Sequence, residues 1–286
     1  TELTKRYQFV KKFIKKNNYT DQFLIFLKTL NSVINSINYL EIRGRDSLGL
    51  MLNISLKKNK KNIFLIKRKF NYKNNFIKIK KNFILINIIY KTCNIFGSLG
   101  DNSKEIIKKI INDYPILKLL KTGNYDNINI IAHTRWASVG KVNIENTHPI
   151  ANVNSRSNKL PTIFSVMNGD IYNYENIISK SKKLKNIQYN NNKSNDALAL
   201  SYLFEDNFIF NNIKKIKKKL SKIEGSFVGA VISDEEASKI LIIKKGNLGL
   251  YYGKSDDREF FSSDLYGLVE ECKHFHELKK NTFSMS

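Results

Sequence analysis

The sequence has only two cysteines and three prolines in 286 residues, and it lacks a long uninterrupted apolar run. Cys93 and Cys272 alone cannot form a disulfide framework or a cysteine-rich zinc site. No apolar segment approaches the roughly 20 residues that span a bilayer, and the lysine-broken start has no signal-peptide core. We therefore expect a cytoplasmic protein that does not insert into a membrane.

Acidic residues are scarce, because 25 Asp and Glu stand against 49 Lys and Arg, and the formal net charge is +24. Such a surplus raises nucleic acid or an anionic membrane as a partner. The lysines, however, are dispersed among asparagine and isoleucine, as at 57–61 and 78–81, without the interleaved aromatic residues on which bases stack. A genome rich in A and T produces the same bias, so we expect no nucleic-acid partner.

The pattern of apolar residues indicates an α+β fold. Helical spacing predicts a helix over 21–40, and short runs with β-branched residues predict strands. The expected strands are 48–56, 63–66, 83–90, 128–132, 163–167, 227–233, 239–244, 249–253 and 259–262. The further expected helices are 104–120, interrupted at Pro115, then 174–184, 196–205, 213–223 and one from Asp264. Strands and helices are grouped rather than alternating, which favours stacked sheets with outer helices.

The segment 131–140 follows an expected strand and enters a glycine-containing loop. At this strand end the planar fork of Arg135 can donate two parallel hydrogen bonds to a carboxylate. The alternative is that Arg135 makes a structural ion pair and that Trp136 belongs to the core. This motif alone leaves both interpretations open.

Asn168 and Gly169 follow another expected strand. A side-chain amide and a neighbouring main-chain N–H can converge on one oxygen and stabilise a tetrahedral oxyanion. Asn-Gly is also a strong turn signal, and for this motif alone a turn is the simpler interpretation.

Four motifs in order resemble the class II glutamine amidotransferase domain of the N-terminal nucleophile hydrolases: 40–49, 133–138, 146–149 and 168–173. The resemblance runs from about 40 to 268 and is strongest to the glutaminase domain of glucosamine-6-phosphate synthases, while 168–173 also looks like asparagine synthetases. It implies a four-layer α/β/β/α sandwich of antiparallel sheets without the first strand. The expected division is a divergent or truncated segment 1–20, the domain 21–275 and the start of a linker, 276–286.

The resemblance also implies roles for single residues. Arg135 would bind the α-carboxylate of L-glutamine, with Trp136 and Ser138 shaping the loop over it, and Asn168 and Gly169 would form the oxyanion hole. An aspartate at a helix start would bind the α-amino group. We favour Asp196 over Asn195, because this register gives the helix one apolar face and leaves a carboxylate for the ammonium. The alternative is that Asp196 is only a helix-start acid. No metal or cofactor is implied, and His133 and His148 are expected to be structural.

The family's nucleophile, a cysteine at the mature N-terminus, has no counterpart at Thr1, where polar residues follow. Cys93 and Cys272 are internal and lack a free α-amino group. Val139 and Met167 also replace histidines of the synthase type. Two explanations follow. One is that the chain belongs to a longer protein, which could form a homodimer and whose isomerase domains would transfer the ammonia to fructose-6-phosphate. The alternative is a homologue that binds glutamine without hydrolysing it. Whether the chain itself is an enzyme stays open.

Overall fold

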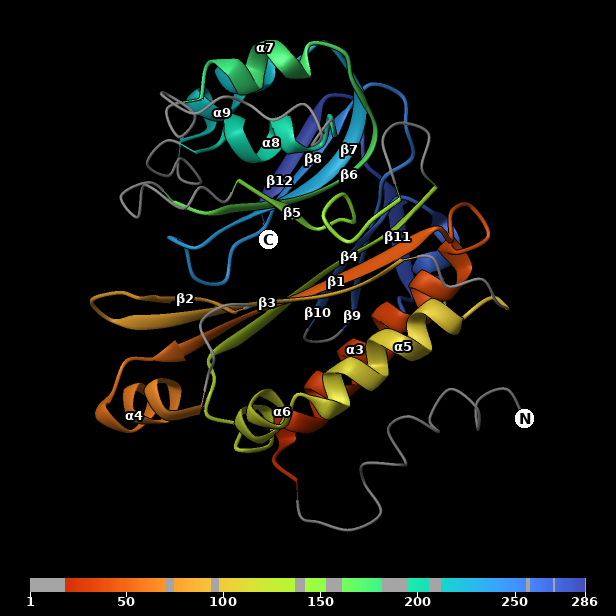
Figure 1. The fold of residues 1–286 in the computed structure, drawn as a ribbon. Helices are drawn as coiled ribbons and strands as arrows, with labels where there is room; N and C mark the ends of the chain where they lie inside the picture. Colours follow the sequence, from red (N-terminus) through yellow and green to blue (C-terminus); the bar gives the residue numbers. More distant parts are fainter. Residues whose placement is uncertain are drawn as a thin grey trace.

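Two antiparallel sheets lie face to face, and helices cover the outer face of each sheet (Figure 1). The computed structural model describes residues 19–69, 75–93, 98–136, 142–152, 161–181, 195–205, 212–255, 258–269 and 271–285. No helix in these ranges is both long and apolar enough to cross a bilayer.

The first sheet has the strand order β2-β3-β1-β4, with β1 at Ser47–Lys57, β2 at Asn75–Ile79, β3 at Phe83–Cys93 and β4 at Asn127–Arg135. The second has the order β12-β8-β7-β6-β5, with β5 at Ile150–Ala151, β6 at Ile163–Ile171, β7 at Gly225–Ser233, β8 at Leu241–Lys245 and β12 at Thr282–Met285. A smaller sheet has the order β10-β9-β11, with β9 at Tyr251–Ser255, β10 at Arg258–Ser262 and β11 at His274–Glu277.

Alternating side chains of β1 explain how the layers hold together. Leu50 and Leu52 point to the helices of the first sheet, whereas Met51 points to the second sheet, and all three are fully buried. The helices on the first sheet are α3 (Asp21–Leu40), α5 (Asp101–Asn112) and α6 (Tyr114–Lys121). Those on the second are α7 (Tyr174–Ser179), α8 (Leu198–Leu203) and α9 (Ile213–Leu220). Separate apolar clusters fill the three interfaces, so the expected four-layer α+β sandwich is confirmed.

Helix α3 has the bounds that its apolar spacing predicts. The hydroxyl of Thr20 caps its start by accepting from the main-chain N–H of Phe23 at 3.3 Å. Phe23 and Leu30 on its inner face are fully buried, and burial of such side chains stabilises by about 1.5–3 kcal/mol each. The helix end delivers the chain to β1 through the loop 41–46.

Several expected elements differ from the structure. The run 63–66 is not a strand but part of α4 (Lys60–Lys69), whose start is capped by the side chain of Asn59 accepting from Asn62 N–H at 2.7 Å. The segment after Asp264 forms only a short 3-10 turn, η2 (Leu265–Gly267), and the helix expected over 196–205 is the shorter α8. The expected interruption of the helix 104–120 is confirmed, but it lies at Asp113, between α5 and α6, and Pro115 stands in the first turn of α6.

Four strands were not predicted: β2, β5, β11 and β12. Strand β12 lies inside the range 276–286, where we expected a linker to begin, yet it pairs with β8 through the register Phe283 to Ile243. This part of the range therefore belongs to the second sheet.

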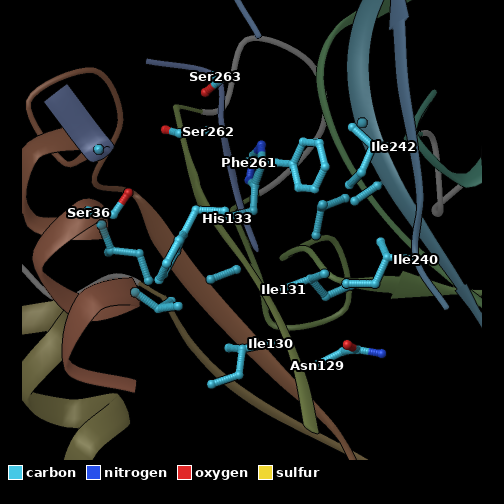
Figure 2. Close-up of a pocket in the computed structure, with 18 of the residues that line it drawn as sticks. Ser36, Asn129, Ile130, Ile131, His133, Ile240, Ile242, Phe261, Ser262 and Ser263 are labelled. Carbon is cyan, nitrogen blue, oxygen red and sulfur yellow. The ribbon is translucent and has the colours of Figure 1, made fainter. Parts of the chain in front are cut away.

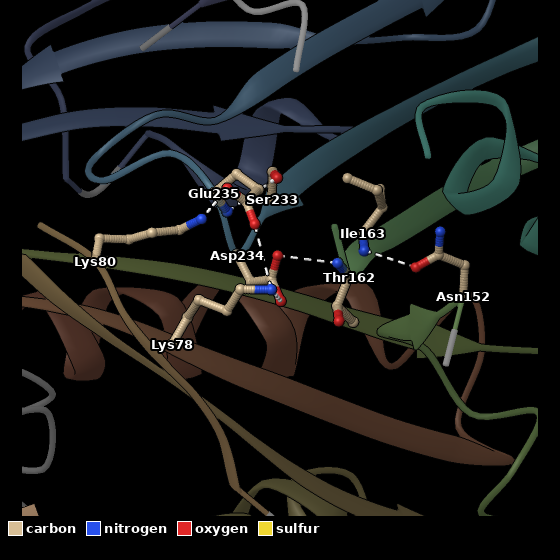
Figure 3. A network of polar contacts seen from close by, with 8 residues as sticks. All are labelled: Lys78, Lys80, Asn152, Thr162, Ile163, Ser233, Asp234 and Glu235. Atoms are coloured by element: carbon tan, nitrogen blue, oxygen red, sulfur yellow. Dashed lines mark hydrogen bonds and ion pairs between the residues drawn. The ribbon is translucent and has the colours of Figure 1, made fainter. Parts of the chain in front are cut away.

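A polar network joins the edge of the first sheet to the second (Figure 3). Lys78 of β2 contacts Asp234 and Glu235, at 3.6 and 3.2 Å, in the turn after β7, and Lys80 also pairs with Glu235. Asp234 in turn accepts from the main-chain N–H of Thr162 at 2.9 Å. The network fixes the β2–β3 hairpin against the start of β6.

Candidate functional site

A cavity of about 890 Å³ lies between α3, β4 and the second sheet, and it brings the predicted residues together. Arg135 and Trp136 come from the end of β4, Asn168 and Gly169 from β6, and Asp196 from the turn before α8. These segments are far apart in the sequence, so their meeting is a property of the fold.

Arg135 is held at the end of β4 by contacts of its main chain. Its carbonyl accepts from the N–H of Asp46 at 3.0 Å, and its register partner is Ser47 on β1. Gly44 makes this approach feasible, because a Cβ there would lie 2.5 Å from the main-chain nitrogen of Trp136. The loop before β1 therefore positions the end of β4.

The guanidinium of Arg135 is a buried cation, since the residue is 9% exposed. Burial lowers its pKa, while the carboxylates of Asp196 and Asp46 oppose that shift. An arginine stays charged in proteins and presents a planar fork of donors, which suits a ligand carboxylate. Trp136 is 71% exposed, so the alternative that it belongs to the core is wrong.

Asn168 and Gly169 lie within β6, opposite Val228 and Phe227 of β7, so the turn interpretation is wrong. Gly169 has φ +108°, and a Cβ there would lie 2.3 Å from the carbonyl oxygen of Ser226. Only glycine fits this position. The side chain of Asn168 is exposed and lines the cavity, which leaves its amide free to meet a ligand.

Asp196 links the start of α8 to the end of β6. Its carboxylate accepts from the main-chain N–H of Ile171 at 2.9 Å and from that of Ala197 at 3.0 Å. Burial raises the pKa of Asp196, and these two hydrogen bonds oppose the shift. The carboxylate thus lines the cavity and also accepts from local N–H groups near the start of α8, while its role toward an ammonium stays a prediction.

The neighbouring Asn195 is occupied by local contacts. It donates to the carbonyl of Asn146 at 3.2 Å, and its side-chain oxygen accepts from Ala197 N–H at 3.0 Å. Asn195 is 5% exposed and carries no charge. Its surroundings favour a structural part, and Asp196 stays the preferred partner for an ammonium.

Two adjacent histidines also line the cavity, with the ring centroids of His133 and His148 4.3 Å apart and their planes tilted by 36°. The Nδ1 of His148 accepts from the main-chain N–H of Met167 at 3.3 Å, directly before Asn168. Burial lowers the pKa of His133 to about 4 and that of His148 well below its ordinary value. Both rings are neutral at neutral pH. The sequence predicted only a structural role for these two isolated histidines. It did not predict that they support β6.

Ser138, Val139 and Thr1 lie outside the described residues. Cys93 and Cys272 are described, and neither lines the cavity. Within the described ranges no group of three or more His, Cys, Asp or Glu side chains is arranged to hold a metal ion.

Comparisons with known proteins show which proteins this chain resembles. A family model for a glutamine amidotransferase domain matches residues 145–270. Glutamine–fructose-6-phosphate aminotransferase (isomerizing) from Clostridium acetobutylicum is 30% identical over 155 residues, which are 54% of this chain and 24% of that protein. The enzyme of the same name from Buchnera aphidicola subsp. Baizongia pistaciae is 28% identical over 258 residues, 89% of this chain and 33% of that protein. The chain thus spans a third or less of these relatives.

Solved structures show the same fold. The allosteric regulatory enzyme of purine biosynthesis matches 84% of this chain and 40% of its own, with a TM-score of 0.52 and 15% identity. Glutamine phosphoribosylpyrophosphate amidotransferase from B. subtilis matches the same shares with a TM-score of 0.50 and 14% identity. The chain therefore contains a class II glutamine amidotransferase domain of the N-terminal nucleophile hydrolase fold, homologous to the glutaminase part of glucosamine-6-phosphate synthase.

Proposed function

We propose that the domain binds L-glutamine in the cavity, with one protein group for each polar end of the ligand. Arg135 pairs with the α-carboxylate, Asp196 with the α-ammonium, and Asn168 with Gly169 N–H hold the side-chain carboxamide oxygen. The observation that carries the proposal is that a buried cation, an oriented carboxylate and an amide line one cavity.

The charges match those of a free amino acid. The arginine fork donates charge-assisted hydrogen bonds and the carboxylate accepts them. Each such bond contributes about 1.5–3 kcal/mol. The neutral amide of Asn168 suits the neutral carboxamide in the ground state and the negative oxygen that develops during hydrolysis. Trp136 lines the cavity and is placed to contact the ligand, whereas the role expected for Ser138 concerns a residue outside the described ones and stays a prediction.

We further propose that the full-length protein hydrolyses glutamine and supplies ammonia for glucosamine-6-phosphate synthesis from fructose-6-phosphate. The relatives described above support this, because they are glutamine–fructose-6-phosphate aminotransferases. Hydrolysis needs a nucleophile, and neither described cysteine lines the cavity. Both cysteines of this chain are among the described residues, so neither is placed to supply the thiol.

Titration calorimetry of the chain with glutamine tests the binding step. Wild type should bind one equivalent, and Arg135→Ala should weaken binding by roughly 100-fold through loss of the charged hydrogen bonds. Arg45→Ala is the matched control, because Arg45 is exposed on the loop before β1 and does not line the cavity. Equal affinity in the two variants would refute the proposed site.

A further inference from the structure

The imidazole of His148 lies between the segments that carry two of the proposed ligand-binding residues. Its Nδ1 accepts from the main-chain N–H of Met167 at 3.3 Å, and its Nε2 lies 3.4 Å from the side-chain nitrogen of Asn195. Met167 directly precedes Asn168, and Asn195 directly precedes Asp196. One rigid ring therefore separates the segment proposed to hold the carboxamide of glutamine from the segment proposed to hold its ammonium.

The bond to Met167 continues the pairing of β5 with β6. Ile150 lies opposite Ser165 in that antiparallel register, so His148 stands at the position opposite Met167. A buried main-chain N–H nearly always has an acceptor, and here the ring takes the place of a carbonyl from a neighbouring strand. The side chain of His148 thus holds the edge of β6 just outside β5.

The ring of His148 is itself held in place by the first sheet. The residue is 4% exposed, and its ring centroid lies 4.3 Å from that of His133 on β4, one of the residues that line the pocket (Figure 2). Gly49 of β1 admits the main chain of His148, because a Cβ there would lie 1.8 Å from the His148 carbonyl oxygen. The ring therefore has a fixed position between the two sheets.

The hydrogen bond from Met167 also determines which nitrogen of the ring carries the proton. Burial lowers the pKa of His148 well below its ordinary value, so the ring is neutral at neutral pH. A neutral imidazole has one N–H, and since Nδ1 is the acceptor, the proton is on Nε2. Both nitrogens of the contact with Asn195 then carry protons, so this contact is packing and the ring acts there as a spacer.

We propose that His148 is a specificity-determining residue, whose ring sets the distance between Asn168 and Asp196 and thereby selects glutamine over asparagine. This role rests on the proposed function, and His148 acts through its two neighbours, as a positioning residue. The two amino acids carry the same ammonium, carboxylate and carboxamide groups, and asparagine is shorter by one methylene. With the ring in place, a ligand held by Asp196 reaches Asn168 only if its chain has the length of glutamine. Without the ring, the two segments can approach each other and accommodate the shorter amide.

Titration calorimetry with glutamine and with asparagine tests the proposal. Wild type should prefer glutamine by roughly 100-fold, within the range that one methylene gives in a fitted pocket. His148→Asn retains an acceptor for Met167 N–H at the position of Nδ1 but lacks the ring, so the preference should fall to about tenfold or less. His274→Asn is the matched control, because His274 is exposed on β11, and it should keep the wild-type preference.

The ratio of the two affinities separates this role from a general loss of structure. If His148→Asn binds both ligands more weakly in equal proportion, or keeps the wild-type preference, the proposal is overturned. A wild type that does not bind glutamine would instead refute the proposed function and, with it, this role.

A measurement on wild-type protein avoids any folding defect of the variant. Long-range ¹H–¹⁵N spectra of the labelled chain at pH 7 report which nitrogen of His148 is protonated. The proton should be on Nε2 alone. A proton on Nδ1 would overturn the proposal, because that nitrogen could not then accept from Met167 N–H.

Discussion

The carboxylate of Asp196 accepts the main-chain N–H of Ile171 at 2.9 Å, two residues beyond Gly169. The group proposed to bind the ligand's ammonium is thereby fixed to the same strand that carries the proposed oxyanion hole. A displacement of β6 would move both, so the two halves of the proposed glutamine pocket are connected through this strand.

Asp196→Asn should weaken glutamine binding by roughly 10- to 100-fold, because it removes the charge that pairs with the α-ammonium. Calorimetry at pH 7 measures the change. Asp170→Asn is the control, since Asp170 also lines the cavity but is exposed. If the two variants bind glutamine equally well, Asp196 does not contact the amine.

Glutamine affinity should also fall with decreasing pH, and the fall should begin above the ordinary pKa range of an aspartate. Burial raises the pKa of Asp196, so the carboxylate loses its charge at a higher pH than an exposed one does. The same titration on Asp196→Asn should be flat in this range. A wild-type profile without this dependence would contradict the assignment.

The stability of the domain should decrease as pH falls below 6.5, because the pKa of His133 is lowered to about 4 in the folded state. The unfolded chain takes up the proton near pH 6.5 and the folded chain does not. Stability is therefore present above pH 6.5 and is lost toward pH 4, at roughly 1 kcal/mol per pH unit from this group. Urea unfolding at several pH values measures the slope.

His133→Gln should reduce that slope, while His276→Gln should leave it unchanged because His276 is exposed on β11. His148, whose pKa is also lowered, should keep part of the dependence in the first variant. A slope that is identical in wild type and His133→Gln would show that this histidine is not protonated differently on unfolding.

Gly169→Ala should destabilise the domain much more than Gly100→Ala. Both glycines have positive φ, +108° and +90°, so both variants carry backbone strain of about 1 kcal/mol or more. At Gly169 a Cβ would lie 2.3 Å from the carbonyl of Ser226, whereas at Gly100 the nearest atom is 3.8 Å away. Chemical denaturation compares the free energies of unfolding, and similar losses would contradict the close packing of β6 on β7.

In the network of Figure 3, Asp234→Ala should reduce the free energy of unfolding by about 1–3 kcal/mol, because Thr162 N–H loses its buried acceptor. Glu235→Gln should change it by less than about 1 kcal/mol, since its pairs with Lys78 and Lys80 are partly solvated. Thermal and urea unfolding measure both. A larger effect at Glu235 would mean that the lysine pairs, not the main-chain bond, join the sheets.

Local pattern predicted much of the fold but not all of it. The long apolar stripe of α3 is unambiguous over 21–40, whereas the four-residue run 63–66 suits a strand or a buried helix turn and was assigned wrongly. Strands β11 and β12 have few apolar residues, and they form because β9 and β8 offer edges to pair with.

The site shows the same division. Arg135 and Asn168 could be named because each belongs to a motif, and Asp196 because it stands at an expected helix start; the structure brings the three to one cavity. The bonds from Met167 N–H to His148 and from the Asn129 side chain to that of Asn53 depend on strand register and on contacts between distant segments. No spacing within the sequence encodes such partners directly.

The most direct test of the glutamine pocket crosses a change in the ligand with a change in the protein. Calorimetry should compare glutamine with its α-methyl ester on wild type and on Arg135→Ala. If Arg135 holds the α-carboxylate, the ester should bind wild type roughly 100-fold more weakly, and Arg135→Ala should bind the two ligands equally. An ester penalty of the same size in both proteins would contradict the account.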